Sequence, residues 1–129
     1  DNHAEMGVKT AIEIELLTEQ LNKQLKEYGY DLPPVVIGTG VNTGTCIVGN
    51  MGSELRFDYS VVGDAVNLGA RLEVQTRSYD TPILISEYTY NEANTACQRI
   101  DEIKVKGKEE PVVIYAPFIK EEVRKLYKK

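Results

Sequence analysis

A strand-like run passes directly into a helix-like run between Arg56 and Arg71, and Gly63 is the only joint between them. The residues before the glycine are mainly aromatic or β-branched, which favours an extended backbone. The residues after it place their apolar side chains at helical spacing. This strand–glycine–helix unit favours the α+β class, in which helices pack on a sheet.

Asn67 and Arg71 stand four residues apart in the helical part of this unit. That spacing puts an amide and a guanidinium on one helical face, one turn apart. An amide can hold a hydroxyl by hydrogen bonding, and a guanidinium can neutralise phosphate charge. The pair therefore suggests a nucleotide-handling corner, and the alternative is two solvated polar residues on an amphipathic helix.

A long amphipathic helix is predicted at the start of the chain, because apolar residues recur there at spacings of three and four. These residues are Ala4, Val8, Ala11, Ile14, Leu17, Leu21, Leu25 and Tyr28. Gly29 is expected to end the helix, and Pro33-Pro34 prevent its continuation.

The remaining predicted elements alternate between hairpins and helices. Residues 35–41 and 45–49 are apolar and β-branched on either side of turn residues 42–44, which predicts a hairpin. Strands are also expected at residues 55–62, 83–85, 99–105 and 112–115, helices at 64–79 and 86–93, and a charged hairpin loop at 106–110. The expected architecture is one antiparallel-rich sheet covered by helices, of ferredoxin-like type.

Composition limits the class of protein. The 129 residues are enough for one domain, and the net charge of -5 argues against a general nucleic-acid binder. No apolar run is long enough to span a membrane, and the polar first residues are unlike a signal peptide. Cys46 and Cys97 are expected to be buried free thiols, with a disulfide as the alternative, which fits a cytosolic setting.

Other polar residues carry weaker signals. Asp58 and Asp64 could bind Mg²⁺ as a pair, but separate roles are favoured, with Asp58 as a surface contact and Asp64 as a helix N-cap. Lys106 could reach a phosphate from its loop, although such a lysine is usually solvated. His3 has no expected ligand or carboxylate partner, so neither metal binding nor acid–base chemistry is predicted for it.

Four ordered segments together resemble a known family. They are residues 35–44, 48–53, 56–73 and 105–108. Their order and spacing resemble the catalytic domain of the class III adenylyl and guanylyl cyclases over nearly the whole chain. The resemblance implies a cyclase-type α+β fold and a phosphorus–oxygen lyase that converts a nucleoside triphosphate to its 3′,5′-cyclic monophosphate and pyrophosphate, in intracellular signalling.

The resemblance also implies roles for four residues. Asn67 would orient the ribose, and Arg71 would stabilise charge on the reacting phosphate. Ser60 falls at the position that contacts the base, where a hydroxyl could serve adenine or guanine. Lys106 matches a lysine that holds the triphosphate tail. Similarity favours ATP as the substrate, and GTP stays open.

The resemblance further implies that two metal-binding Asp residues precede this chain. Mg²⁺ or Mn²⁺ is expected for the intact domain, with its ligands absent here, so the chain alone is expected to be inactive. Residues 1–118 are expected to form part of the cyclase domain, truncated at the N-terminus, and residues 119–129 a C-terminal helical tail. A homodimer or domain-swapped oligomer is expected, without nucleic-acid or membrane contact. The alternative is a catalytically dead cyclase-like domain with a regulatory or dimerisation role.

Overall fold

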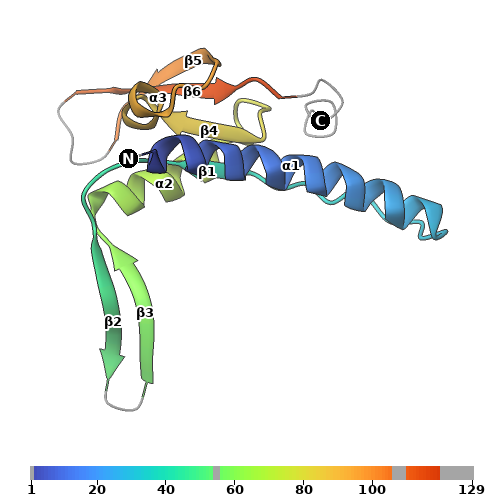
Figure 1. Cartoon of the computed structure of the whole chain (residues 1–129), viewed down its shortest axis with the longest axis horizontal. Helices are drawn as coiled ribbons and strands as arrows, with labels where there is room; N and C mark the ends of the chain where they lie inside the picture. Colours follow the sequence, from blue (N-terminus) through green and yellow to red (C-terminus); the bar gives the residue numbers. More distant parts are fainter. Residues whose placement is uncertain (1, 54–55, 106–109, 120–129) are drawn as a thin grey trace.

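The structure is a computed structural model that describes residues 2–53, 56–105 and 110–119. Three helices and six strands follow one another along this part of the chain (Figure 1). The helices are α1 (His3–Glu27), α2 (Asp64–Gln75) and α3 (Glu87–Ala93), and the strands are β1 (Thr39–Val41), β2 (Ile47–Ser53), β3 (Arg56–Val62), β4 (Ile83–Ser86), β5 (Cys97–Ile103) and β6 (Val112–Pro117). The expected α+β class with an antiparallel-rich sheet is confirmed. The predicted C-terminal tail lies outside the described residues from residue 120 onward.

The central sheet has four strands in the order β1-β4-β6-β5. Strands β1 and β4 pair in parallel, whereas β4 with β6 and β6 with β5 pair antiparallel. Strand β4 is buried along its whole length, so both faces of the sheet are covered. Ile83 and Ile85 point toward α1 and α3, and Leu84 points toward α2, because successive side chains of a strand alternate between faces.

Two hydrophobic clusters hold the three layers together. The first joins α1 and α3 to the sheet through Ala4, Val8, Ala11, Ile83, Ile85 and Ala93. The second joins α2 to the other face through Leu68, Leu72, Leu84, Ile103, Val112 and Ile114. No helix in the described part of the chain is both long and apolar enough to cross a membrane.

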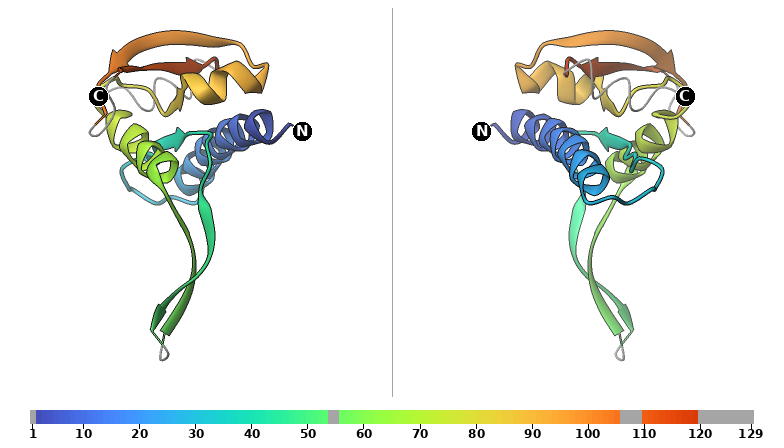
Figure 2. Two further views of the ribbon diagram at one scale, coloured as in Figure 1. Left: turned by 90° about the vertical axis from the view of Figure 1, so that its left-hand side faces the viewer. Right: turned by 90° about the vertical axis from the view of Figure 1, so that its right-hand side faces the viewer.

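Strands β2 and β3 form a separate hairpin that projects away from these layers (Figures 1 and 2). The predicted hairpin between residues 35–41 and 45–49 is therefore wrong. Strand β1 pairs with β4 instead, with Thr39 opposite Ile83, and β2 pairs with β3. The supposed turn fails to close because Asn42 and Thr43 bond to other elements, to Ala65 and Thr89 respectively.

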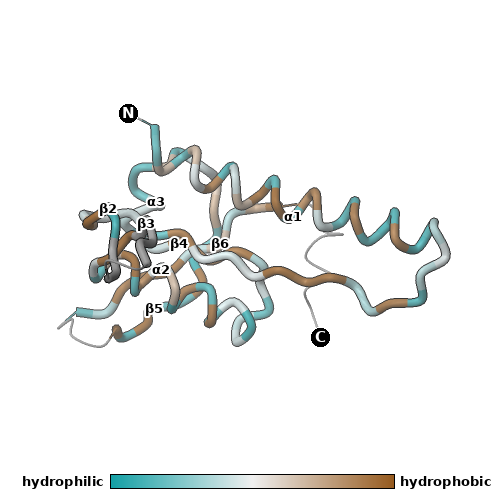
Figure 3. The backbone as a smooth tube through the Cα atoms, turned by 90° about the horizontal axis from the view of Figure 1, so that it is seen from below, coloured by the Kyte–Doolittle hydropathy of each residue, from teal (hydrophilic) through white to brown (hydrophobic). Residues whose placement is uncertain are grey.

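Helix α1 ends as predicted but does not bury all of its apolar residues. Gly29 has a φ of 86° directly after the helix, the left-handed conformation that glycine adopts readily. The first half packs on the sheet, whereas Leu17 is 61% exposed, and the buried position there belongs to Glu15. The distal half of α1 and the apolar segment that follows it extend beyond the sheet (Figure 3).

Both cysteines are free thiols, so the alternative of a disulfide is wrong. Cys46 is exposed, and Cys97 is only half-buried, which corrects the prediction that both are buried. Cys46 lies between β1 and the projecting hairpin, away from both hydrophobic clusters. Partial burial raises the pKa of the Cys97 thiol to about 11, so this thiol stays protonated at neutral pH.

Candidate functional site

The predicted strand–glycine–helix unit is confirmed. Strand β3 ends at Val62 and helix α2 begins at Asp64, with Gly63 between them. Gly63 has a φ of 145°, which an L side chain rarely adopts, so the glycine makes the sharp change in direction possible. Gly63 is also the N-cap, and Asp64 is already helical. The prediction that the Asp64 side chain caps the helix is therefore wrong.

Helix α2 lies against β1 at backbone distance. A Cβ added to Gly40 would come within 2.5 Å of the Glu73 nitrogen and would also strike the Gly69 carbonyl. A Cβ on Gly44 would lie 2.7 Å from the Ala65 Cβ. Glycine is therefore required at Gly40, where no flexible side chain could yield. These contacts place Ala65 and Gly69 on the packed face of α2.

A hydrogen-bonded network crosses from β1 to both neighbouring helices. The Asn42 Nδ2 donates a 2.8 Å hydrogen bond to the Ala65 carbonyl in the first turn of α2. The Asn42 Oδ1 accepts from the Ser86 hydroxyl, and Ser86 is the N-cap of α3. The hydroxyls of Thr43 and Thr89 lie 2.9 Å apart. The start of α2 is thus tied to the start of α3 through one amide.

Asn67 and Arg71 are both exposed on α2, one turn apart. Each lies two residues beyond a residue of the packed face, or about 200° around the helix, so the pair points away from β1. Among the described residues, neither side chain forms a hydrogen bond or an ion pair. The structure therefore presents an amide and a guanidinium together, available to an external group.

The two predicted substrate-contact residues are less fully described. Ser60 lies in β3 opposite Gly49, three residues before the Gly63 joint, so its strand leads directly into α2. The Ser60 side chain lies outside the described part of the structure, as does Lys106 altogether. The loop that carries Lys106 joins β5 to β6, which are antiparallel neighbours as predicted.

No metal centre is formed by the described residues. They contain no group of three or more His, Cys, Asp or Glu side chains placed to hold an ion. Asp64 is exposed at the start of α2, and the Asp58 side chain lies outside the described part. The His3 imidazole does have a carboxylate neighbour, because its Nε2 lies 3.8 Å from Glu92, which corrects the prediction that it has none.

Glu15 has a shifted pKa, and so do both members of the Tyr79–Asp101 pair. Glu15 is only 3% exposed, and desolvation raises the pKa of its carboxyl to about 7. The Tyr79 hydroxyl donates a 2.7 Å hydrogen bond to Asp101, which lowers the pKa of that carboxyl and raises the pKa of Tyr79.

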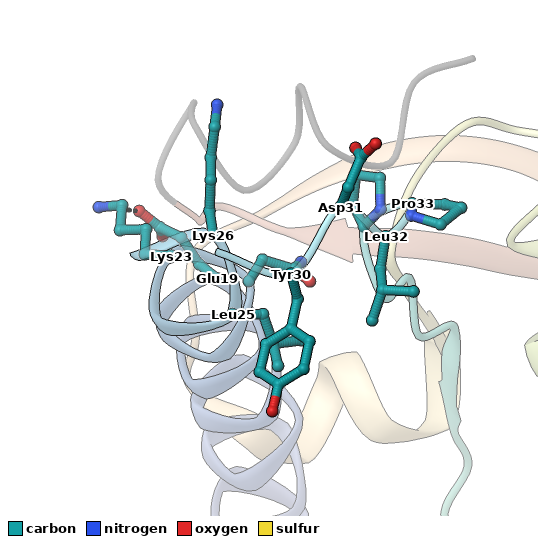
Figure 4. A pocket seen from close by; sticks show the side chains of 10 residues that line it. Glu19, Lys23, Leu25, Lys26, Tyr30, Asp31, Leu32 and Pro33 are labelled. Atoms are coloured by element: carbon teal, nitrogen blue, oxygen red, sulfur yellow. Dashed lines mark ion pairs between the residues drawn. The ribbon is translucent and has the colours of Figure 1, made fainter. Parts of the chain in front are cut away.

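Two of the hollows in the described surface lie beside α2 and at the end of α1, and neither is lined by Asn67 or Arg71. One, of about 630 Å³, lies between β1, the base of the hairpin and the packed side of α2. The other, of about 520 Å³, lies between the end of α1 and the segment that follows it (Figure 4). Its walls carry charges of both signs, including the Lys23–Glu19 ion pair at 3.2 Å. Two hydrogen bonds between the Asn22 side chain and the Val35 backbone hold the segment against α1.

Sequence reasoning missed the residues that hold α2 in place. Asn42 belongs to the predicted hairpin turn at 42–44, which gave no reason to expect its bonds to Ala65 and Ser86. A usable signal for Gly40 is its place inside an apolar strand-like run, because glycine in the interior of a strand often marks close approach of another backbone.

Comparison with known proteins places the chain in a family. The family model for the adenylate and guanylate cyclase catalytic domain matches residues 2–117 of the sequence. An adenylate cyclase of Anabaena cylindrica is 32% identical over 124 residues, which cover 89% of this chain and 24% of that protein.

Solved structures give the same result. The adenylyl cyclase CyaB from P. aeruginosa matches with a TM-score of 0.72 and 36% identity, covering 84% of this chain and 55% of that one. The guanylyl cyclase Cya2 matches with a TM-score of 0.72 and 37% identity, covering 88% and 57%. The chain thus spans about a quarter of the Anabaena protein and just over half of each solved cyclase. It belongs to the family of adenylate and guanylate cyclase catalytic domains.

Proposed function

We propose that this chain supplies the Asn67–Arg71 half of a nucleotide cyclase active site. The observation that carries the proposal is this exposed, unengaged pair on a helix that is firmly packed on its other side. The family match over residues 2–117 gives the reaction class. Residues 1–118 form part of the catalytic domain in this proposal, and residues 119–129 a tail.

The two side chains suit the two demands of cyclisation. The 3′-hydroxyl gives up its proton to solvent, and its oxygen must approach the α-phosphorus in line with the bond to pyrophosphate, which breaks as the new ester bond forms. Asn67 holds the ribose through its amide and so fixes the direction of the 3′-oxygen. Arg71 places a permanent positive charge against the phosphate oxygens, where negative charge is redistributed in the transition state.

We assign ATP as the preferred substrate, with GTP as the alternative. Ser60 is the proposed base contact, and its hydroxyl can donate or accept a hydrogen bond. Lys106 is proposed to hold the triphosphate tail. The relatives named above include both adenylyl and guanylyl cyclases, so the family alone leaves the base open.

The described residues do not fit a divalent metal site, because no group of three or more candidate ligands is present among them. We propose, from the family resemblance, that the Mg²⁺ or Mn²⁺ ligands of the intact domain are not supplied by this chain, and we derive no step through the metal. In this proposal a second copy of the intact domain completes the site, as a homodimer or a domain-swapped oligomer. The chain alone is inactive. The proposed location is the cytoplasm. The lack of a group of metal ligands among the described residues also favours one alternative, a catalytically inactive cyclase-like domain with a regulatory or dimerisation role.

An assay of the complete catalytic domain tests the proposal. The domain is incubated with ATP or GTP and with Mg²⁺ or Mn²⁺, and cyclic nucleotide and pyrophosphate are measured. Cyclic AMP should form faster than cyclic GMP, and the 129-residue chain alone should form neither. A complete domain that binds the metal but makes no cyclic nucleotide would favour the dead regulatory domain instead.

A further inference from the structure

We propose that Asn42 is a positioning residue for cyclisation. Its side chain fixes helix α2 and thereby the placement of Asn67 and Arg71, without touching the substrate. The predicted effect on turnover rests on the proposed function, whereas the predicted effect on α2 rests on the structure alone.

Asn42 uses both ends of its amide. Its Nδ2 donates to the Ala65 carbonyl at 2.8 Å, and its Oδ1 accepts from Ser86. Ser86 is fully buried and its hydroxyl also accepts from the Thr89 backbone amide, so the anchor on this side is part of the protein interior. The bond to Ala65 therefore connects the first turn of α2 to a fixed point.

This bond adds directionality to the packing between α2 and β1. The contacts of Gly40 with Gly69, and of Gly44 with Ala65, are close but non-directional, so small residues alone would let a helix rotate or slide. A hydrogen bond weakens steeply when its angle is poor, so it resists rotation about the helix axis.

The position of the bond matters for the exposed pair. Ala65 precedes Asn67 by two residues and Arg71 by six, so all three lie within the first eight residues of α2. A rotation that broke the Asn42 bond would carry both exposed side chains sideways relative to β1. Misplacement of catalytic groups by about 1 Å can cost about a hundredfold in rate.

The test is Asn42→Asp in the complete catalytic domain. The aspartate keeps the shape and the acceptor for Ser86 but has no N–H to donate to Ala65. The matched control is Asn22→Asp, because the Asn22 Nδ2 also donates to a backbone carbonyl, that of Val35, at 3.0 Å. Both variants lose one amide donor, but only one of the lost bonds reaches α2.

Two readouts are measured on each variant: kcat and KM for cyclisation, and amide hydrogen exchange along the backbone. Asn42→Asp should lower kcat by about tenfold to a hundredfold with KM nearly unchanged, and should speed exchange in α2. Asn22→Asp should change neither kcat nor exchange in α2. In an Arg71→Ala background, Asn42→Asp should cause a smaller loss of kcat than in the native background, because part of its effect acts through that arginine.

Each contrary result has a definite meaning. Unchanged exchange in α2, or an Asn42→Asp loss that adds in full to that of Arg71→Ala, overturns the inference. If the complete domain makes no cyclic nucleotide, the proposed function has failed, and the exchange measurement alone decides the role of Asn42. If Asn42→Asp does not fold, Asn42→Gln replaces it, since the longer stem shifts the donor and predicts the same fall in kcat.

Discussion

Glu15 gives the sharpest prediction about stability. Its side chain is 3% exposed, and its Oε1 has no hydrogen-bond partner among the described residues. Desolvation raises the pKa of the carboxyl from 4.5 to about 7. That difference corresponds to about 3 kcal/mol, at about 1.4 kcal/mol for each tenfold change in proton affinity.

The direction of the pH dependence follows from whether the folded or the unfolded state keeps the Glu15 proton to higher pH. Below pH 4.5 both the folded and the unfolded chain hold a protonated Glu15, and its ionisation costs nothing. Between pH 4.5 and about 7 the unfolded state releases the proton first, so the free energy of unfolding falls as the pH rises. The full penalty is present above pH 7.

The variant Glu15→Gln removes the ionisation and keeps the shape. Relative to the native sequence, its free energy of unfolding should therefore be about 3 kcal/mol larger at pH 8 than at pH 4.5. Urea unfolding followed by circular dichroism measures both values, and taking the difference cancels other titrations. Glu13→Gln is the control, because Glu13 is exposed on the same helix. Parallel pH profiles for Glu15→Gln and the native sequence would refute the reasoning.

Three further predictions follow. Gly40→Ala should lower the free energy of unfolding by about 1 to 3 kcal/mol, because the added Cβ would strike the backbone of α2. Gly49→Ala should be nearly neutral, because Gly49 has open space around it. Equal urea midpoints for the two variants would contradict this. Tyr79→Phe should raise the pKa of Asp101 toward its ordinary value, measured by NMR titration, because the lost hydroxyl is the main cause of the lowering. The isolated chain should self-associate in light scattering, because apolar residues of α1 are exposed, and a monomer at micromolar concentration would argue otherwise.

Local chemistry allowed the element types and several ends to be predicted. The left-handed Gly29 ends α1, as the sequence indicated, and the helix predicted to begin at Ser86 is present, with the Ser86 hydroxyl accepting from the Thr89 amide. These features depend on residues a few positions apart. Pairing of β1 with β4 does not, because it joins Thr39 to Ile83, which lie far apart in the sequence. Hairpin rules favour the nearest partner and here selected the wrong one.

The buried face of α1 shows a second limit. Apolar spacing placed Ile14 and Leu17 on the packed side, but Glu15 occupies it. Neighbouring positions on a helix differ by only about 100° around its axis. When apolar residues cover a broad part of the helix surface, the sequence alone does not locate the middle of the buried face. The Asn67–Arg71 pair could be predicted because one helical turn fixes its geometry. Asn42 could not, because its role depends on contacts with two elements distant in sequence.

Arg71→Ala in the complete catalytic domain tests the central claim most directly. Arg77→Ala is the matched control, since Arg77 is an exposed arginine just beyond α2 whose ion pair with Glu73, at 3.6 Å, is a surface contact. Loss of transition-state charge stabilisation should lower kcat by about a hundredfold to a thousandfold with little change in KM, and Arg77→Ala should retain nearly full kcat. Equal kcat values for Arg71→Ala and Arg77→Ala would contradict the assignment of Arg71 to the reacting phosphate.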